Sequence, residues 1–163
     1  MARIKEAKVF TGCHPKTERI LYDDLPYLLK QRYNKHHAFF ELKEEIDVEW
    51  NGYRINVYTG AITDLSSIPR VLEFFGVHRF TPKGEWDCAS ICHDLICHGA
   101  ARFPDVNNWN NIRLADQLYR DMGVACGAPK WRARVRYRAL RMVGTLKYKY
   151  IHGQAPVMEI ARV

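Results

Sequence analysis

The sequence predicts an α+β fold in which an N-terminal antiparallel β-hairpin or small sheet precedes three helices. Two stretches of alternating hydrophobic and polar residues flank Asn51-Gly52, as in a β-hairpin. Three segments of helical length follow this hairpin, and strands and helices segregated along a chain are typical of α+β proteins. With 163 residues, 47% of them hydrophobic, the chain is long enough for one domain with a single core.

The domain is expected to consist of three parts. Residues 1–37, interrupted by Pro15 and Pro26, are expected to be an irregular extension with a short helix around Asp24 to Tyr33. Residues 38–150 form the predicted core, and residues 151–163 are predicted to be a C-terminal arm. The first residues are charged and lack an apolar run, so we expect a soluble protein made in the cytosol without a secretion signal.

The hairpin is the first element of the core. From Phe39 to Trp50 hydrophobic and charged residues mostly alternate, which predicts a strand. Asn51-Gly52 supplies the positive φ angles of a two-residue turn, and the alternation resumes from Tyr53 to Val57. A loop rich in hydroxyl side chains, residues 61–70, is expected to follow the hairpin.

The helices are expected at residues 85–98, at 111–122 and from Pro129 onward. Gly123 is expected to end the second helix. Proline suits the first turn of a helix, which favours Pro129 as the start of the third. The segment from Trp131 to Tyr137 alternates as a strand does, but the good helix formers that follow it favour a helix.

The cysteines are expected to be free thiols, mostly buried in the core. Their odd number and the absence of a signal peptide argue against a disulfide framework. The spacing Cys88-x3-Cys92 differs from the C-x2-C pair of a zinc knuckle, which disfavours zinc. The five are Cys13, Cys88, Cys92, Cys97 and Cys126.

Basic residues accumulate near the C-terminus. The chain carries 25 Lys+Arg against 18 Asp+Glu, a net charge of +7, and the segment Lys130–Lys149 contains basic but no acidic residues. Such a segment attracts polyanions, which include anionic lipid, nucleic acid and acidic protein surfaces, unless it is simply a solvated helix face.

Three residues on the first two helices could carry chemistry. His93 and Asp94 are adjacent, so their side chains point about 100° apart and cannot pair with each other. If the two helices pack antiparallel, Asp116 can accept a hydrogen bond from one ring nitrogen of His93, which would orient the other as a general base for water. Asp94 and Asp64 would then bind a hard cation such as Ca²⁺. The alternative is that these aspartates are solvated or paired with arginines.

Three motifs occur in the order of a known family. They are G-x-x-T-D-L-S-S-I-P-R from Gly60 to Arg70, the His93-Asp94 pair, and R-x-x-A-D from Arg113 to Asp116. Together they resemble an uncharacterised family common in tailed bacteriophages and prophages. The resemblance implies a phage protein made in the host bacterial cytoplasm, which either stays there or enters the virion.

The same two helices resemble a second family. Residues 87–94 followed by residues 115–122 are similar to the active-site helices of phospholipase A2, especially its prokaryotic branch. The resemblance implies that His93 is the general base, Asp94 binds calcium and Asp116 orients the histidine. The glycine-rich calcium loop of that family has no counterpart here, and Asp64 would take its place.

Two functions follow as hypotheses. The first is a calcium-dependent lipid-ester hydrolase that contacts anionic membrane lipid through Lys130–Lys149. The second is a non-catalytic phage virion or tail component, or a host-interaction protein, whose partners would be other phage proteins or a host protein. Nucleic-acid binding ranks last because no known nucleic-acid-binding module is recognisable, and it would not be sequence-specific.

Overall fold

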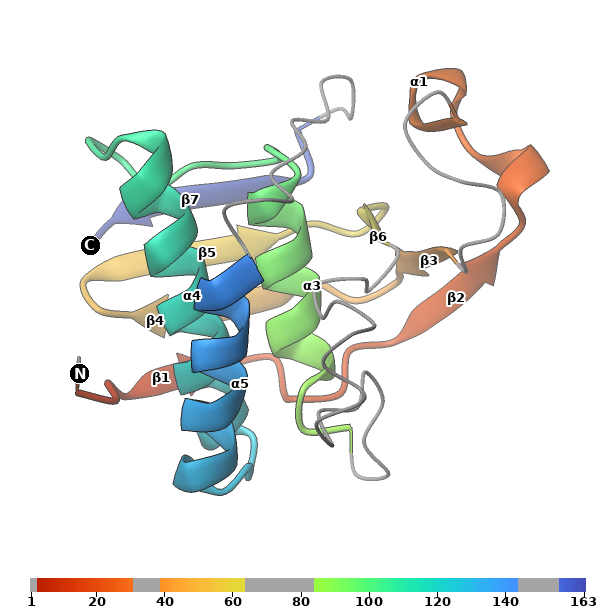
Figure 1. Ribbon diagram of the computed structural model, residues 1–163. Coiled ribbons are helices and arrows are strands. Elements are labelled where there is room, and N and C mark those ends of the chain that lie inside the picture. Colours follow the sequence, from red (N-terminus) through yellow and green to blue (C-terminus); the bar gives the residue numbers. More distant parts are fainter. Residues whose placement is uncertain (1–2, 31–38, 64–83, 144–155) are drawn as a thin grey trace.

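The computed structural model describes residues 3–30, 39–63, 84–143 and 156–163 (Figure 1). The strands are β1 (Ala7–Val9), β2 (Thr17–Ile20), β3 (Phe39–Leu42), β4 (Ile46–Trp50), β5 (Tyr53–Val57), β6 (Ile62–Thr63) and β7 (Met158–Arg162). The helices are the 3-10 helix η1 (Tyr22–Asp24), α1 (Tyr27–Lys30), α3 (Asp87–Cys97), α4 (Asn108–Ala125) and α5 (Lys130–Val143). N-terminal strands followed by helices confirm the predicted α+β class.

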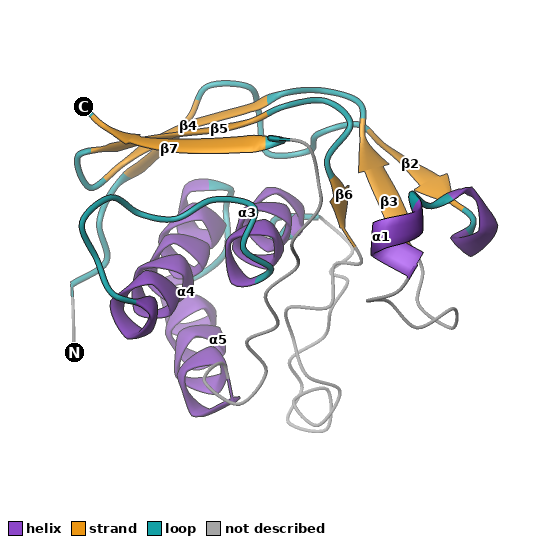
Figure 2. Cartoon of the chain, turned by 90° about the horizontal axis from the view of Figure 1, so that it is seen from above, coloured by secondary structure: helices purple, strands orange, loops and turns teal. Residues whose placement is uncertain are grey.

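The described strands form two antiparallel sheets. The larger sheet has the order β1-β4-β5-β7 and the smaller one the order β2-β3-β6. Figure 2 shows α3, α4 and α5 on one side of the larger sheet, with the smaller sheet and α1 beside them. Strands β4 and β5 each bury every second residue, so the main core lies between this sheet and the helices. No described helix has the length and hydropathy needed to span a bilayer.

The predicted hairpin is confirmed. Trp50 pairs with Tyr53 at the end of the β4–β5 ladder, and Asn51 and Gly52 have φ angles of 51° and 77°. The single strand predicted from Phe39 to Trp50 is wrong, because β3 and β4 belong to different sheets. The chain bends over Lys43-Glu44-Glu45, three consecutive charged residues that leave no apolar side chain to bury at the junction.

The terminal segments also differ from the prediction. The first 37 residues are not irregular throughout, because β1 pairs with β4 and β2 pairs with β3. The expected C-terminal arm contains β7, which pairs with β5 and buries Met158 and Ile160 against the core. These edge strands are three to five residues long, too short for a periodic pattern to stand out.

Helices α3 and α4 pack antiparallel. Three contacts follow one another along the pair: Trp86 packs on Gly123, the Ser90 side chain hydrogen-bonds Tyr119, and His93 contacts Asp116. The prediction that Gly123 ends the second helix is wrong, because α4 continues to Ala125. A Cβ at Gly123 would lie 2.0 Å from the Trp86 ring, so the glycine permits close packing of the helices rather than a turn.

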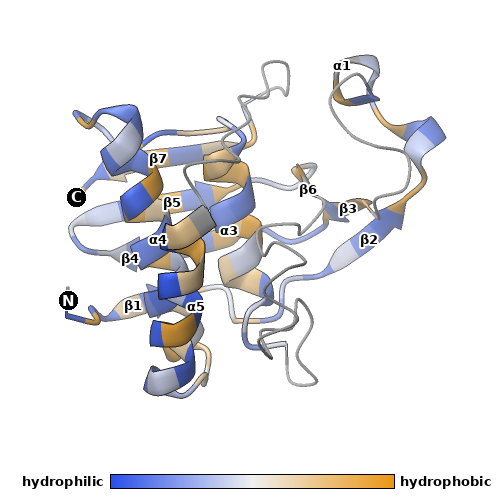
Figure 3. Ribbon diagram, in the orientation of Figure 1, coloured by the Kyte–Doolittle hydropathy of each residue, from blue (hydrophilic) through white to orange (hydrophobic). Residues whose placement is uncertain are grey.

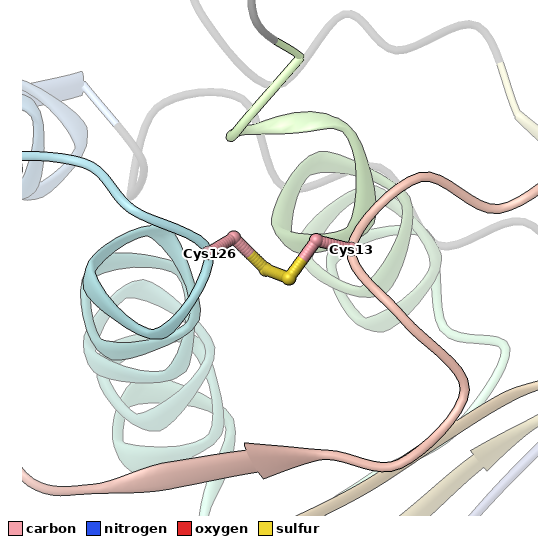
Figure 4. Close-up of a disulfide and its surroundings, with 2 residues drawn as sticks. All are labelled: Cys13 and Cys126. Carbon is pink, nitrogen blue, oxygen red and sulfur yellow. A yellow bond between two sulfur atoms is a disulfide. The ribbon is translucent and has the colours of Figure 1, made fainter.

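A disulfide joins Cys13 to Cys126 (Figure 4), which corrects the prediction that all five cysteines are free. It connects the segment after β1 to the end of α4 across 113 residues of sequence. Cys88, Cys92 and Cys97 are free, and the first two are buried in the core. An odd cysteine count excludes complete pairing but leaves room for one bridge, and only the fold brings these two residues together.

Candidate functional site

The site centres on a histidine–aspartate pair between α3 and α4. His93 Nε2 lies 2.6 Å from Asp116 Oδ1, and the two residues are 4% and 0% exposed. Because a carboxylate can only accept, Nε2 carries the proton and Nδ1 is left as the basic nitrogen of the neutral ring. The contact predicted for antiparallel helices is therefore present, while its catalytic role stays a prediction.

A third helix completes the pair. Arg141 of α5 donates from Nη1 to the second carboxylate oxygen of Asp116 at 2.9 Å, and its side chain is 19% exposed. Arg141 thus supplies a cationic partner to the buried carboxylate of Asp116. Sequence reasoning missed this role because it counted Arg141 among the basic residues of Lys130–Lys149.

A thiol lies beside the histidine ring. Cys97 Sγ is 3.8 Å from Nδ1 and 3.6 Å from Nε2 of His93, and Cys97 is half-buried at the last position of α3. Residues four apart on a helix share a face, so the i, i+4 spacing was the signal from which this contact could have been expected. The basic nitrogen of His93 therefore has a sulfur nearby.

An aromatic and cationic stack holds the ring in place. The Tyr119 ring makes an edge contact with His93 at 5.5 Å and stacks on Trp86 at 4.9 Å. Arg136 donates to the Tyr119 hydroxyl at 2.8 Å and lies 4.5 Å over the Trp86 ring. These buried contacts restrict the orientation of the imidazole and keep the surroundings of the dyad low in dielectric.

Burial lowers the pKa of His93, but the neighbouring Cys97 sulfur and the Asp116 carboxylate outweigh it and hold the pKa well above the usual 6.5. The protonated form is therefore favoured in the folded state. The contribution of His93 to the free energy of unfolding is complete below the pKa that the ring has in the unfolded chain, and it is lost as pH rises through the pKa of the folded state.

We expect the free energy of unfolding to fall as pH rises above 6.5 toward the folded pKa of His93. Urea denaturation at a series of pH values measures this slope. The variant His93→Gln lacks the titrating group and should show a flatter dependence over the same window. Parallel profiles for the two proteins would show that another group causes the slope.

Asp94 points away from the dyad. Its Oδ2 accepts a hydrogen bond from the Thr63 hydroxyl, and its Oδ1 lies 3.4 Å from His98 Nδ1. Asp64, the other predicted calcium ligand, lies outside the described residues, as does most of the loop that contains it. The structure therefore brings His93 and Asp116 together but does not test whether Asp94 and Asp64 meet.

The described residues do not by themselves fit a calcium ion. Calcium takes six to eight oxygen ligands, and both oxygens of Asp94 already have protein partners. Across the described ranges, no group of three or more His, Cys, Asp or Glu residues could hold a metal. Calcium binding by Asp94 and Asp64 stays a prediction.

A second buried carboxylate on α4 has a structural role. Asp121 accepts hydrogen bonds from Trp50 Nε1 at 2.8 Å, Arg120 Nε at 2.7 Å and the Lys5 backbone at 3.2 Å. Arg120 also donates to the Arg3 carbonyl at 3.2 Å. This cluster joins β4 and the N-terminal segment to α4. The Asp121 carboxylate can be buried because its oxygens accept these hydrogen bonds.

Comparison with known proteins gives one result. The family model described as "Protein of unknown function (DUF1353)" matches residues 40–140, which include both members of the histidine–aspartate pair. No curated protein and no solved structure matches the chain. Because the match covers well over half of the chain, this protein is a member of the DUF1353 family, whose function is unknown.

Proposed function

We propose that this protein is an ester hydrolase in which His93 is the general base and Asp116 orients it. The observation that carries the proposal is the 2.6 Å contact between His93 Nε2 and Asp116 Oδ1, both buried between α3 and α4. A carboxylate on one ring nitrogen fixes the tautomer and stabilises the imidazolium that forms when the other nitrogen takes a proton.

The proposed reaction is a direct attack by water. In the neutral form of His93, which becomes populated as pH rises toward the raised pKa of the ring, Nδ1 takes a proton from the water, whose oxygen adds to the ester carbonyl carbon. The tetrahedral intermediate then collapses with cleavage of the ester C–O bond, and the imidazolium returns its proton to the departing alkoxide. Asp116 stabilises the imidazolium, and Arg141 donates to the second oxygen of Asp116 at 2.9 Å.

Lipid esters are the substrate class that we propose, and a tailed phage is the proposed origin. Both rest on the sequence resemblances described above, and the antiparallel α3–α4 pair is compatible with the phospholipase comparison. The roles proposed for His93, Asp116 and Arg141 do not involve a metal ion. If Asp94 and Asp64 hold a calcium ion, it would supply charge stabilisation to the reaction, so calcium dependence is included in the test.

The test is fatty-acid release from phosphatidylglycerol and phosphatidylethanolamine vesicles, with calcium or with chelator. Replacing His93 by alanine should lower release about 10²- to 10⁴-fold, the usual contribution of a general base. His14→Ala is the matched control, because His14 is exposed and lies outside α3 and α4. Circular dichroism of each variant verifies folding. Full release by His93→Ala would refute the proposed mechanism.

One observation favours a second function, that of a non-catalytic phage component. His93, Asp94 and Asp116 are at most 4% exposed, and each contacts another side chain, as in a structural polar cluster. In that case neither wild type nor His93→Ala releases fatty acid although both fold. Mass spectrometry of purified virions would then test whether the protein is a virion component.

A further inference from the structure

Helix α5 carries apolar side chains on its outward face. Trp131, Val135 and Met142 are 62%, 45% and 77% exposed. Their spacings of four and seven residues place them in one line along the helix. A line of large exposed apolar side chains opposite the buried face indicates a surface that binds a partner.

The buried face of the same helix lies on the opposite side. Ala133, Arg136 and Leu140 are each at most 2% exposed, and α5 packs mainly on α4. In Figure 2 the helix lies on the side of α4 away from the larger sheet. The line of Trp131, Val135 and Met142 therefore belongs to the outside of the described fold rather than to its core.

Basic side chains lie on both sides of this line and also within it, because Arg138 shares the face of Val135 and Met142. Lys130, Arg132, Arg134 and Arg138 are exposed, and α5 contains no acidic residue. The Arg132 guanidinium lies 5.2 Å over the Trp131 ring. Two other arginines of the helix, Arg136 and Arg141, bind Tyr119 and Asp116 and therefore add nothing to this surface. Figure 3 shows the resulting mixture of hydrophobic and hydrophilic positions along α5.

We propose that this face of α5 docks on an anionic lipid bilayer. Helices that lie in the membrane interface combine large apolar side chains with Lys and Arg on their flanks. Trp131, Val135 and Met142 would enter the boundary between headgroups and acyl chains, and the flanking cations would contact lipid phosphates. This proposal is independent of the hydrolase proposal, because docking requires none of the dyad residues.

The apolar line favours a bilayer over nucleic acid. A nucleic-acid surface needs cations for phosphates and flat side chains on which bases stack. Trp131 suits either a bilayer or a nucleic acid, but Val135 and Met142 offer neither a charge nor a stacking ring. These two side chains lower the free energy of binding only where the partner removes their apolar surface from water, as the acyl region of a bilayer does.

Vesicle co-sedimentation tests the proposal, with phosphatidylglycerol–phosphatidylcholine vesicles against phosphatidylcholine alone at low and high salt. We expect binding to the anionic vesicles only, and weaker binding as salt rises. Arg134→Gln/Arg138→Gln should weaken binding roughly 10- to 30-fold, from about 1 kcal/mol for each cation. Lys16→Gln/Arg19→Gln is the matched control, because it removes the same charge from exposed positions near β2 and should bind as wild type.

Tryptophan fluorescence tests insertion directly. Trp131 and Trp109 are exposed whereas Trp50 and Trp86 are buried, so a blue shift on adding vesicles should disappear in Trp131→Phe and persist in Trp109→Phe. Val135→Ser/Met142→Ser should lower vesicle binding while keeping every charge. His93→Ala should bind vesicles as wild type, which separates failure of docking from failure of hydrolysis.

Two results would overturn the docking proposal. One is unchanged vesicle binding by both the arginine and the serine variants. The other is α5-dependent binding of a DNA oligonucleotide by a protein that does not bind vesicles, which would assign the surface to nucleic acid.

Discussion

Removing the Cys13–Cys126 disulfide is expected to lower the free energy of unfolding by about 3–5 kcal/mol. The bridge connects residues 113 apart, so it restricts the unfolded chain across most of its length. In the folded state it attaches the segment after β1 to the end of α4. Urea denaturation of wild type and of Cys13→Ser/Cys126→Ser measures the loss.

Reductant provides the matched control for this experiment. Dithiothreitol should destabilise the wild type to about the same extent and leave the double variant unchanged. Alkylation of the urea-unfolded, non-reduced protein should modify three thiols, those of Cys88, Cys92 and Cys97. Modification of all five, or equal stability with and without reductant, would show that the bridge does not form in solution.

The features of the fold that sequence could predict are local ones. Asn51-Gly52 defined the hairpin because few residue pairs accept two successive positive φ angles. The pairing of β7 with β5 and the bridge between Cys13 and Cys126 depend on residues about a hundred positions apart. Short strands and a single disulfide have no periodicity of their own, so only the assembled core reveals them.

Of the candidate site, the sequence predicted the histidine–aspartate pair but not the residues that support it from other helices. His93 and Asp116 could be paired from the sequence only on the condition that the two helices pack antiparallel, a condition that α3 and α4 meet. Arg141 could not be identified, because in a basic helix only the exact helical phase decides which arginines turn inward. Gly123 was misjudged for a similar reason, since its small size accommodates Trp86 on the neighbouring helix.

Replacing Asp116 by alanine is expected to destabilise the protein by about 3–5 kcal/mol, the usual loss when one partner of a buried ion pair is removed. The carboxylate is 0% exposed and joins α3 to α5 through His93 and Arg141. Without it, the Arg141 cation keeps no carboxylate partner at this position. Glu45→Ala removes an exposed carboxylate from a position without a positive φ angle and should change stability by less than about 0.5 kcal/mol.

The variant Asp116→Asn separates the two roles of this carboxylate. Asparagine has one side-chain oxygen, so if that oxygen accepts from His93 Nε2, the amide nitrogen faces the Arg141 donor, and both the negative charge and one of the two hydrogen bonds are lost. The pKa of His93 should then fall, because burial lowers it and the Asp116 charge no longer raises it. Nuclear magnetic resonance titration of the His93 ring proton measures this change. An unchanged pKa would mean that Asp116 holds the helices together without tuning the histidine, which would favour the structural function over the hydrolase.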